Sequence, residues 1–229
     1  MKHKIITFGE LMLRLSPDNN ERFTQAHSYE AVYGGGEANT AVSLANFNVD
    51  TRYVTKLPKH TIGQSAVNSL RQYGVDVSRI VRGGDQIGIY FLEKKTSQRP
   101  TNVIYNRNGS AFALAAKEDF DWDSIFDGAT WFHFSGITPA ISDNMAEITI
   151  EACKEAKKRG ITVSCDLNYR SKLWSSEKAN KVMSEVCRYV DICIANEDDA
   201  VGIFGMDASK SDKEKNAYIA EELTKMFPN

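Results

Sequence analysis

The stretch Tyr33-Gly34-Gly35-Gly36-Glu37-Ala38-Asn39 marks the point where extended chain meets an apolar helix. Alternating apolar and polar residues over 22–32 predict a strand, and the helical spacing of apolar residues over 38–47 predicts a helix. The three glycines remove every Cβ from the turn between them, so backbone N–H groups can approach a bound molecule closely. The helix that follows adds free amides and a partial positive charge at its first turn. A tight connection without a ligand is the alternative interpretation.

The composition is that of a soluble globular protein, with 229 residues of which 42% are hydrophobic and 25% charged. A net charge of −2 with scattered basic residues argues against a nucleic-acid partner. No apolar run approaches the roughly 20 residues that cross a bilayer, so no membrane partner is expected. The four cysteines lack metal or redox spacing and lie in apolar surroundings, which predicts buried thiols in a reducing cytoplasm. The four histidines show no metal-ligand spacing.

The order of the predicted elements indicates an α/β protein. A short buried strand is predicted at 4–8, and from residue 131 onward strands and helices alternate, at 131–134, 143–159, 161–165, 177–190 and 191–195. Such alternation implies parallel strands with right-handed crossovers. A polar loop is expected at 209–216 and a last helix at 217–226.

Two separated stretches, 10–33 and 86–109, are instead rich in alternating strand patterns, and 87–106 reads as an antiparallel hairpin. We expect them to form a small sheet beside an α/β core made of 1–9, 34–85 and 110–229. One face of such a sheet would be uncovered, so it should close over a ligand or pair with another subunit.

Polar residues follow three predicted strands, at the edge where open parallel sheets bind ligands: Ser135-Gly136-Ile137, Asp166-Leu167-Asn168-Tyr169-Arg170 and Asn196-Glu197-Asp198-Asp199. Polar residues are common at strand ends, so each group alone is weak evidence. Asp166, Asn168 and Arg170 alternate along a segment predicted to be extended, which would turn them toward one crevice.

The small sheet carries a second candidate cluster, Tyr90, Tyr105 and Arg107. Two tyrosines beside an arginine can stack on a sugar and bind an anionic group, although a solvated cross-strand cluster is the alternative. Arg107 and Arg170 together favour an acidic small molecule, because the planar guanidinium matches a carboxylate or phosphate in bidentate fashion.

With these residues in place, the chain resembles the ribokinase-like (PfkB) carbohydrate kinases, and within them most of all the 2-keto-3-deoxygluconate kinases. The similar segments run in order through the whole chain: Ile6–Pro17, Gly34–Asn39, Ile104–Arg107 with Ser110-Ala111, Asp166–Arg170 and Asn196–Ala200. The resemblance implies a three-layer α/β/α core with a mostly parallel sheet and a small antiparallel β lid. Lids of this family often pair to make dimers, which implies a homo-oligomer, and the buried thiols already indicate a cytoplasmic location.

The resemblance also implies an activity, the ATP- and Mg²⁺-dependent phosphorylation of a sugar acid, 2-keto-3-deoxygluconate, to its 6-phosphate. The substrate-binding residues that it implies are Gly34, Gly35, Asn39, Tyr90, Tyr105, Arg107 and Arg170. Asn168 and Asn196 would lie toward the phosphates of the nucleotide, and Asp199 would organise Mg²⁺ through water.

Two departures from the family pattern matter. Asp199 stands where the family has a glutamate, which shortens the reach of the carboxylate by one methylene. The Gly-Ala-Gly-Asp motif that carries the catalytic base is absent from residues 1–229. No catalytic residue is therefore assigned, and we expect a C-terminally incomplete chain that is inactive by itself and prone to aggregate through an unpaired sheet edge. A fructokinase or other PfkB sugar kinase, and a shortened protein that binds a sugar acid without catalysis, are the alternatives.

Overall fold

A computed structural model describes residues 3–207 and 212–229. The chain divides into two compact units. We call Met1–Phe8 with Ala116–Asn229 the strand–helix unit, and Gly9–Ala115 the lid-bearing unit. Both stretches of the predicted lid, 10–33 and 86–109, belong to the lid-bearing unit, together with residues 34–85.

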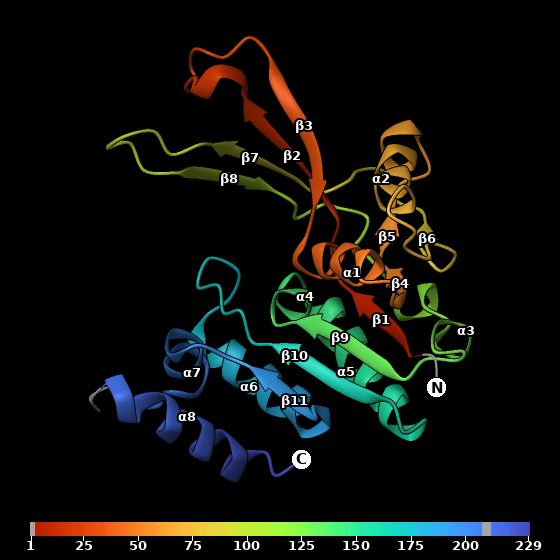
Figure 1. Ribbon diagram of the computed structural model, residues 1–229, viewed down its shortest axis with the longest axis vertical. Helices are drawn as coiled ribbons and strands as arrows, with labels where there is room; N and C mark the ends of the chain where they lie inside the picture. Colours follow the sequence, from red (N-terminus) through yellow and green to blue (C-terminus); the bar gives the residue numbers. More distant parts are fainter. Residues whose placement is uncertain (1–2, 208–211) are drawn as a thin grey trace. The chain divides into compact units, whose positions relative to one another are not determined.

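Parallel strands form the centre of the strand–helix unit. Their order is β11 (Ile192–Ile194), β10 (Thr162–Asp166), β9 (Trp131–Ser135) and β1 (Lys4–Phe8) (Figure 1). Phe8, Phe132 and Val163 are fully buried in them, as expected for strands that are covered on both faces. The predicted α/β class with a mostly parallel sheet is confirmed, and the predicted bounds of these strands differ from the observed ones by two residues at most.

The helices of this unit follow the strands in alternation: α3 (Trp122–Ile125), α4 (Ile137–Ala140), α5 (Asp143–Lys158), α6 (Ser176–Val186), α7 (Glu197–Phe204) and α8 (Asp212–Met226). The longest, α5, begins where the Ser142 side chain accepts a hydrogen bond from the amide of Met145. It ends before Gly160, whose positive φ of 68° suits glycine.

The structure corrects two predicted segments in this unit and adds one helix. Residues 212–216, predicted as a polar loop, belong to α8, while 209–211 lie outside the described residues. The helix predicted over 177–190 ends at Val186 and gives way to a 3-10 turn at Cys187–Tyr189. Helix α7 was not predicted, because its eight residues begin within the polar run after β11.

The lid-bearing unit contains a four-stranded sheet that we call the lid sheet. Its order is β3 (Tyr29–Gly34), β2 (Met12–Pro17), β7 (Ile89–Glu93) and β8 (Asn102–Asn106) (Figure 1). The outer pairs β2–β3 and β7–β8 are antiparallel as predicted, and the hairpin is confirmed. The central pair β2–β7 runs parallel, because both strands lead away from the base of the sheet while β3 and β8 return to it.

The strand predicted over 22–32 is wrong in its first half. Residues 23–25 form a turn after the 3-10 turn at Asp18–Asn20, and extended structure begins only at Tyr29. Asn19 and Asn20 both have positive φ, a conformation that asparagine tolerates better than most residues. A hydrogen bond from the Ser28 hydroxyl to the Asp18 carboxylate closes this loop.

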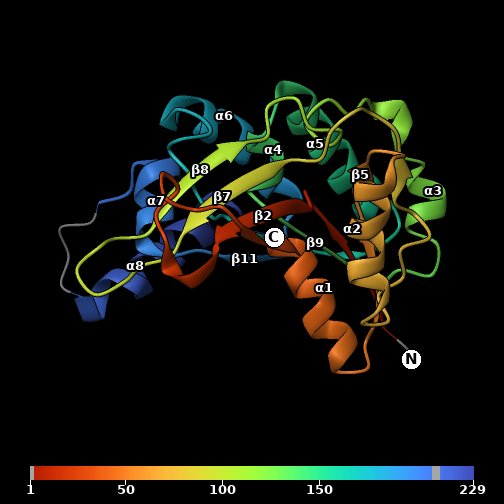
Figure 2. The same ribbon diagram turned by 90° about the horizontal axis from the view of Figure 1, so that it is seen from above.

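The core of the lid-bearing unit lies between its helices and one face of the lid sheet. The remaining elements are α1 (Gly36–Asn46), α2 (Thr61–Arg71), β4 (Asp50–Val54), β5 (Lys56–Leu57) and β6 (Val81–Arg82). Ala41 of α1 and Val67 of α2 pack with Leu13 of β2 in one apolar cluster, and Figure 2 shows the two helices next to each other.

Three of the four cysteines are buried as predicted, whereas Cys193 is exposed on β11. That strand is the last in the sheet order, so among the described residues it pairs with one strand, β10. Within the described residues, no helix has the length and apolar character that a membrane span requires.

Candidate functional site

The three glycines of the turn between β3 and α1 have different surroundings. A Cβ on Gly35 would lie 2.2 Å from the carbonyl oxygen of Glu10, so the protein's own packing demands glycine there. A Cβ on Gly36 would meet nothing within 4 Å. A Cβ on Gly34 would lie 3.8 Å from Asn39 Oδ1 and 4.0 Å from the Tyr90 hydroxyl. Of the three, Gly34 is therefore the one that faces the polar groups predicted to bind the ligand.

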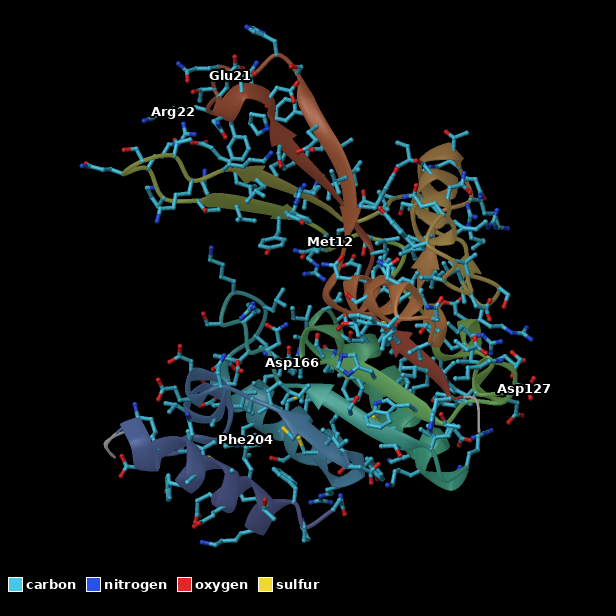
Figure 3. The ribbon with its side chains drawn as sticks, viewed as in Figure 1. Met12, Glu21, Arg22, Asp127, Asp166 and Phe204 are labelled. Atoms are coloured by element: carbon cyan, nitrogen blue, oxygen red, sulfur yellow. The ribbon has the colours of Figure 1, made fainter. Side chains whose placement is uncertain are left out.

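Two tyrosines on the lid sheet extend the group formed by Gly34 and Asn39. Tyr90 and Tyr105 are opposite each other on β7 and β8, and their rings stack with centroids 5.8 Å apart. The guanidinium carbon of Arg107 lies 5.9 Å from the centroid of the Tyr105 ring. Gly34, Asn39, Tyr90, Tyr105 and Arg107 thus form a continuous series, which we call the lid site. Met12, labelled in Figure 3, is the β2 residue paired with Gly34 at the base of the sheet.

A pocket of about 330 Å³ opens beside this series, between β3, α1 and α2. Gly34 and Asn39 line it together with Tyr33, Ser43 and Tyr73. Its walls therefore offer amide and hydroxyl groups next to the glycine turn, the chemistry that a hydroxyl-rich ligand requires.

Arg107 forms an ion pair with Glu10, a contact that was not predicted from the sequence. Its Nε donates to Oε2 of Glu10 at 2.7 Å, its Nη2 forms an ion pair with the same oxygen, and Ser110 donates to Oε1 at 2.5 Å. Glu10 is 4% exposed and Arg107 6%. Burial raises the pKa of the Glu10 carboxyl, while Arg107 and Ser110 act in the opposite direction. The signal available in the sequence was a glutamate two residues after the end of a buried strand, a position that requires a cation or donors nearby.

The second group of predicted residues lies in the strand–helix unit, at the carboxyl ends of β10 and β11. Asn168 has a positive φ of 41° and follows the end of β10, so the chain is not extended there. The prediction that Asp166, Asn168 and Arg170 alternate along one extended segment is therefore wrong. Arg170 is exposed, and its Nη1 donates to the carbonyl of Tyr169.

Asn196 and Asp199 form a capping box at the start of α7. Asn196 Oδ1 accepts the amide of Asp199 at 2.8 Å, and the Asp199 carboxylate accepts the amides of Asn196 at 3.1 Å and of Tyr169 at 2.7 Å. Asp199 is 3% exposed, whereas Asn196 lines a cavity of about 780 Å³ between β11 and α8. The spacing of a capping residue and a carboxylate three positions later was the sequence signal for this helix.

Asp166, labelled in Figure 3 at the carboxyl end of β10, adds a second carboxylate here. Burial raises the pKa of Asp166, and the negative charge of Asp199 raises it further. Within the described residues, no three histidine, cysteine or acidic side chains group closely enough to hold a metal ion directly. Two nearby carboxylates, with Asp199 already holding two amides, fit a cation bound through water.

Arg107 belongs to the lid-bearing unit and Arg170 to the strand–helix unit. The expectation that both reach one ligand stays a prediction, as do the roles assigned to the individual site residues.

The sequence pattern of the pfkB family of carbohydrate kinases matches residues 2–227, and the chain belongs to this family. It is 37% identical over 209 residues to the 2-dehydro-3-deoxygalactonokinase of Haloferax volcanii, covering 90% of this chain and 65% of that protein. It is 28% identical to the 2-dehydro-3-deoxygluconokinase of Bacillus subtilis, covering 77% and 55%. The chain thus spans less than two thirds of the length of these relatives.

A solved structure is similar over the whole chain. The crystal structure of 2-dehydro-3-deoxygluconokinase from Thermotoga maritima superimposes with a TM-score of 0.96 at 49% identity, covering 100% of this chain and 69% of that one. The predicted ribokinase-like resemblance is confirmed by these comparisons.

Proposed function

We propose that this chain supplies the sugar-acid-binding part of an ATP-dependent kinase that phosphorylates 2-keto-3-deoxygluconate (2-dehydro-3-deoxygluconate) on its 6-hydroxyl. The observation that carries the proposal is the lid site, in which hydroxyl-binding groups lead through two stacked tyrosines to a guanidinium. The names of the similar proteins from Bacillus subtilis and Thermotoga maritima support the same substrate.

The lid site offers a separate chemistry for each part of a sugar acid. The Asn39 amide and the Tyr90 hydroxyl suit sugar hydroxyls, and the half-exposed ring of Tyr105 suits an apolar sugar face. Glu10 engages the Nε and Nη2 edge of Arg107, which leaves the Nη1 edge for the carboxylate of the ligand. Arg170, exposed in the other unit, is the second proposed carboxylate ligand.

The nucleotide would be ATP with Mg²⁺. Asn168 and Asn196 would face its phosphates, and Asp199 would hold the waters of the metal. In the reaction the bond between the γ-phosphorus and the bridging oxygen breaks, a bond from the sugar 6-oxygen to that phosphorus forms, and the hydroxyl proton leaves. Such a transfer depends mainly on positioning and charge neutralisation.

The lid sheet is also the proposed contact between two copies of the chain. Ile104 of β8 is 50% exposed, which leaves apolar surface on a strand at the edge of this sheet. We propose a cytoplasmic homo-oligomer that covers this surface.

A second candidate substrate is the epimeric acid, 2-keto-3-deoxygalactonate. The observation that favours it is the 37% identity with the Haloferax volcanii enzyme named for that sugar. Fructose is disfavoured because a neutral sugar requires neither arginine.

The test is calorimetric titration of the chain with both acids and with fructose, without nucleotide. We expect fructose to bind at least about tenfold more weakly than the preferred acid, and Arg107→Met or Arg170→Met to reduce that ratio. A coupled ADP-release assay on the whole gene product that contains this chain then tests phosphorylation. If fructose binds as tightly as both acids, or if neither arginine variant changes the ratio, the assignment to sugar acids is wrong.

A further inference from the structure

Four chain crossings join the lid sheet to the rest of the lid-bearing unit. The chain enters β2 after Glu10, returns from β3 at Gly34-Gly35, enters β7 after Gly88 and returns from β8 at Arg107. These crossings are far apart in the sequence, yet one residue belongs to the first crossing and contacts the other three.

That residue is Glu10. Its carbonyl oxygen would lie only 2.2 Å from a Cβ on Gly35, so a larger residue does not fit there. Its Oε1 would be 2.5 Å from a Cβ on Gly88 and accepts the hydroxyl of Ser110. Its Oε2 binds the Nε and Nη2 groups of Arg107. Glu10 therefore contacts the other three crossings as well as forming the first.

The contact with Arg107 fixes the direction of the guanidinium. A carboxylate that binds the Nε and Nη2 edge restricts rotation of the whole planar group, because the five N–H donors keep a fixed geometry. Burial strengthens this restraint, since water competes little with partners that are nearly inaccessible. The same guanidinium lies next to the Tyr105 ring, and that ring stacks on Tyr90.

We propose that Glu10 is a positioning residue, which holds Arg107 in the orientation that binds a ligand carboxylate and ties this orientation to the base of the lid sheet. The proposal rests on the proposed function, because it assigns to Arg107 the carboxylate of a sugar acid. Glu10 itself contacts neither the ligand nor the nucleotide in this scheme.

The lid sheet contains a matched control. Glu93, at the far end of β7, is also a buried glutamate, and its Oε1 lies 3.5 Å from Nε of Arg99. Glu10→Gln and Glu93→Gln each remove one buried carboxylate from the lid-bearing unit, but only the first change touches Arg107.

The experiment measures binding of 2-keto-3-deoxygluconate and of its neutral carboxamide to the full chain by calorimetry. Glu10→Gln should weaken binding of the acid at least about tenfold and of the carboxamide less than about twofold, while Glu93→Gln leaves both within about twofold. A purely structural role would weaken both ligands equally, and that outcome overturns the proposal. Unchanged or tighter binding of the acid to Glu10→Gln also overturns it.

If Glu10→Gln does not fold, Ser110→Ala replaces it, because this change keeps the Glu10 carboxylate while removing the hydrogen bond to Oε1, together with the one that Ser110 Oγ accepts from the amide of Ala113. It should weaken binding of the acid about two- to fivefold and spare the carboxamide, and an equal effect on both ligands contradicts the proposal.

A readout without ligand separates this proposal from the proposed function. The Nε–H resonance of Arg107, observed by ¹⁵N NMR, should be protected from exchange in the wild type and lost in Glu10→Gln. If the wild type binds no sugar acid while this change is still seen, the proposed function fails and the restraint on Arg107 stands. If the resonance is unaffected by Glu10→Gln, the positioning role is wrong.

Discussion

Glu10 and Asp199 are both buried carboxylates near the end of a strand, but the protein satisfies them differently. Glu10, in the lid-bearing unit, binds the side chains of Arg107 and Ser110. Asp199, in the strand–helix unit, accepts main-chain amides of Tyr169 and Asn196. Amides bring no opposite formal charge, and the raised pKa of Asp166 reflects the negative charge of Asp199 after burial. The first centre is therefore suited to orient a cationic side chain, whereas the second connects the start of α7 to the loop after β10.

The largest expected effect on stability comes from removing the Arg107 guanidinium next to Glu10. Arg107→Met leaves Glu10 buried without its ion-pair partner, which should lower the free energy of unfolding by about 3–5 kcal/mol. Urea denaturation measures this loss. Lys117→Met removes one partner of the exposed Lys117–Glu147 pair and should leave the free energy of unfolding almost unchanged. Equal losses in the two variants would show that burial does not distinguish the Glu10 centre.

The second centre should respond less strongly, because its partners carry no formal charge. Asp199→Ala leaves two main-chain amides without their acceptor, so we expect a loss of about 2–3 kcal/mol. Asn196→Ala removes only the helix cap and should cost about 1 kcal/mol. Thermal or urea unfolding of both variants tests the order. An Asn196→Ala loss as large as that of Asp199→Ala would contradict the idea that Asp199 joins α7 to the loop after β10.

A smaller change in stability is expected where the main chain of Glu10 approaches Gly35. Gly35→Ala places a Cβ against the Glu10 carbonyl and should destabilise the protein by about 1–3 kcal/mol. Gly36→Ala, one position later, meets no atom and should stabilise α1 by about 0.5–1 kcal/mol. The two unfolding midpoints should therefore move in opposite directions, and a shift of both in the same direction would argue against the tight approach at Gly35.

The smallest effect is a dependence on pH. Because burial raises the pKa of Glu10 in the folded protein above its ordinary value of 4.5, the folded state holds this proton more tightly than the unfolded state. The resulting stabilisation is fully present below pH 4.5 and is lost as the pH rises through the folded-state pKa. Unfolding free energies measured across this range should fall less steeply for Glu10→Gln than for the wild type. Parallel curves would mean that Arg107 and Ser110 fully offset the effect of burial on the pKa of Glu10.

Local patterns were enough to predict most elements of this fold. The short apolar run at Lys4–Phe8 and the residues typical of strands at Asn102–Asn106 predicted β1 and β8 with their observed bounds. Pattern reading was wrong over 22–28, where apolar residues lie in turns closed by Asp18 and Ser28. The parallel pairing of β2 with β7 joins strands that are far apart in the sequence, and the residue pattern of neither strand predicts it.

The candidate site was predicted by residue type but not by its pairing. Gly34, Asn39, Tyr90, Tyr105 and Arg107 were all named from the sequence and lie together in the structure. The partner of Arg107 could not be inferred, because Glu10 is 97 positions away and no local spacing connects the two. Likewise, the residues after Asp166 do not alternate along an extended strand, because Asn168 has a positive φ. The pattern of apolar residues does not predict that backbone conformation.

The parallel pair at the centre of the lid sheet has a consequence for biosynthesis. The β2–β3 hairpin can form soon after it leaves the ribosome, since its strands are close in the sequence. The seam between β2 and β7 must wait until α1 and α2 have been made, and closing so long a loop is slow. The nascent chain therefore passes through a stage in which one side of β2 offers unpaired backbone groups, and chaperone binding at that stage would protect it.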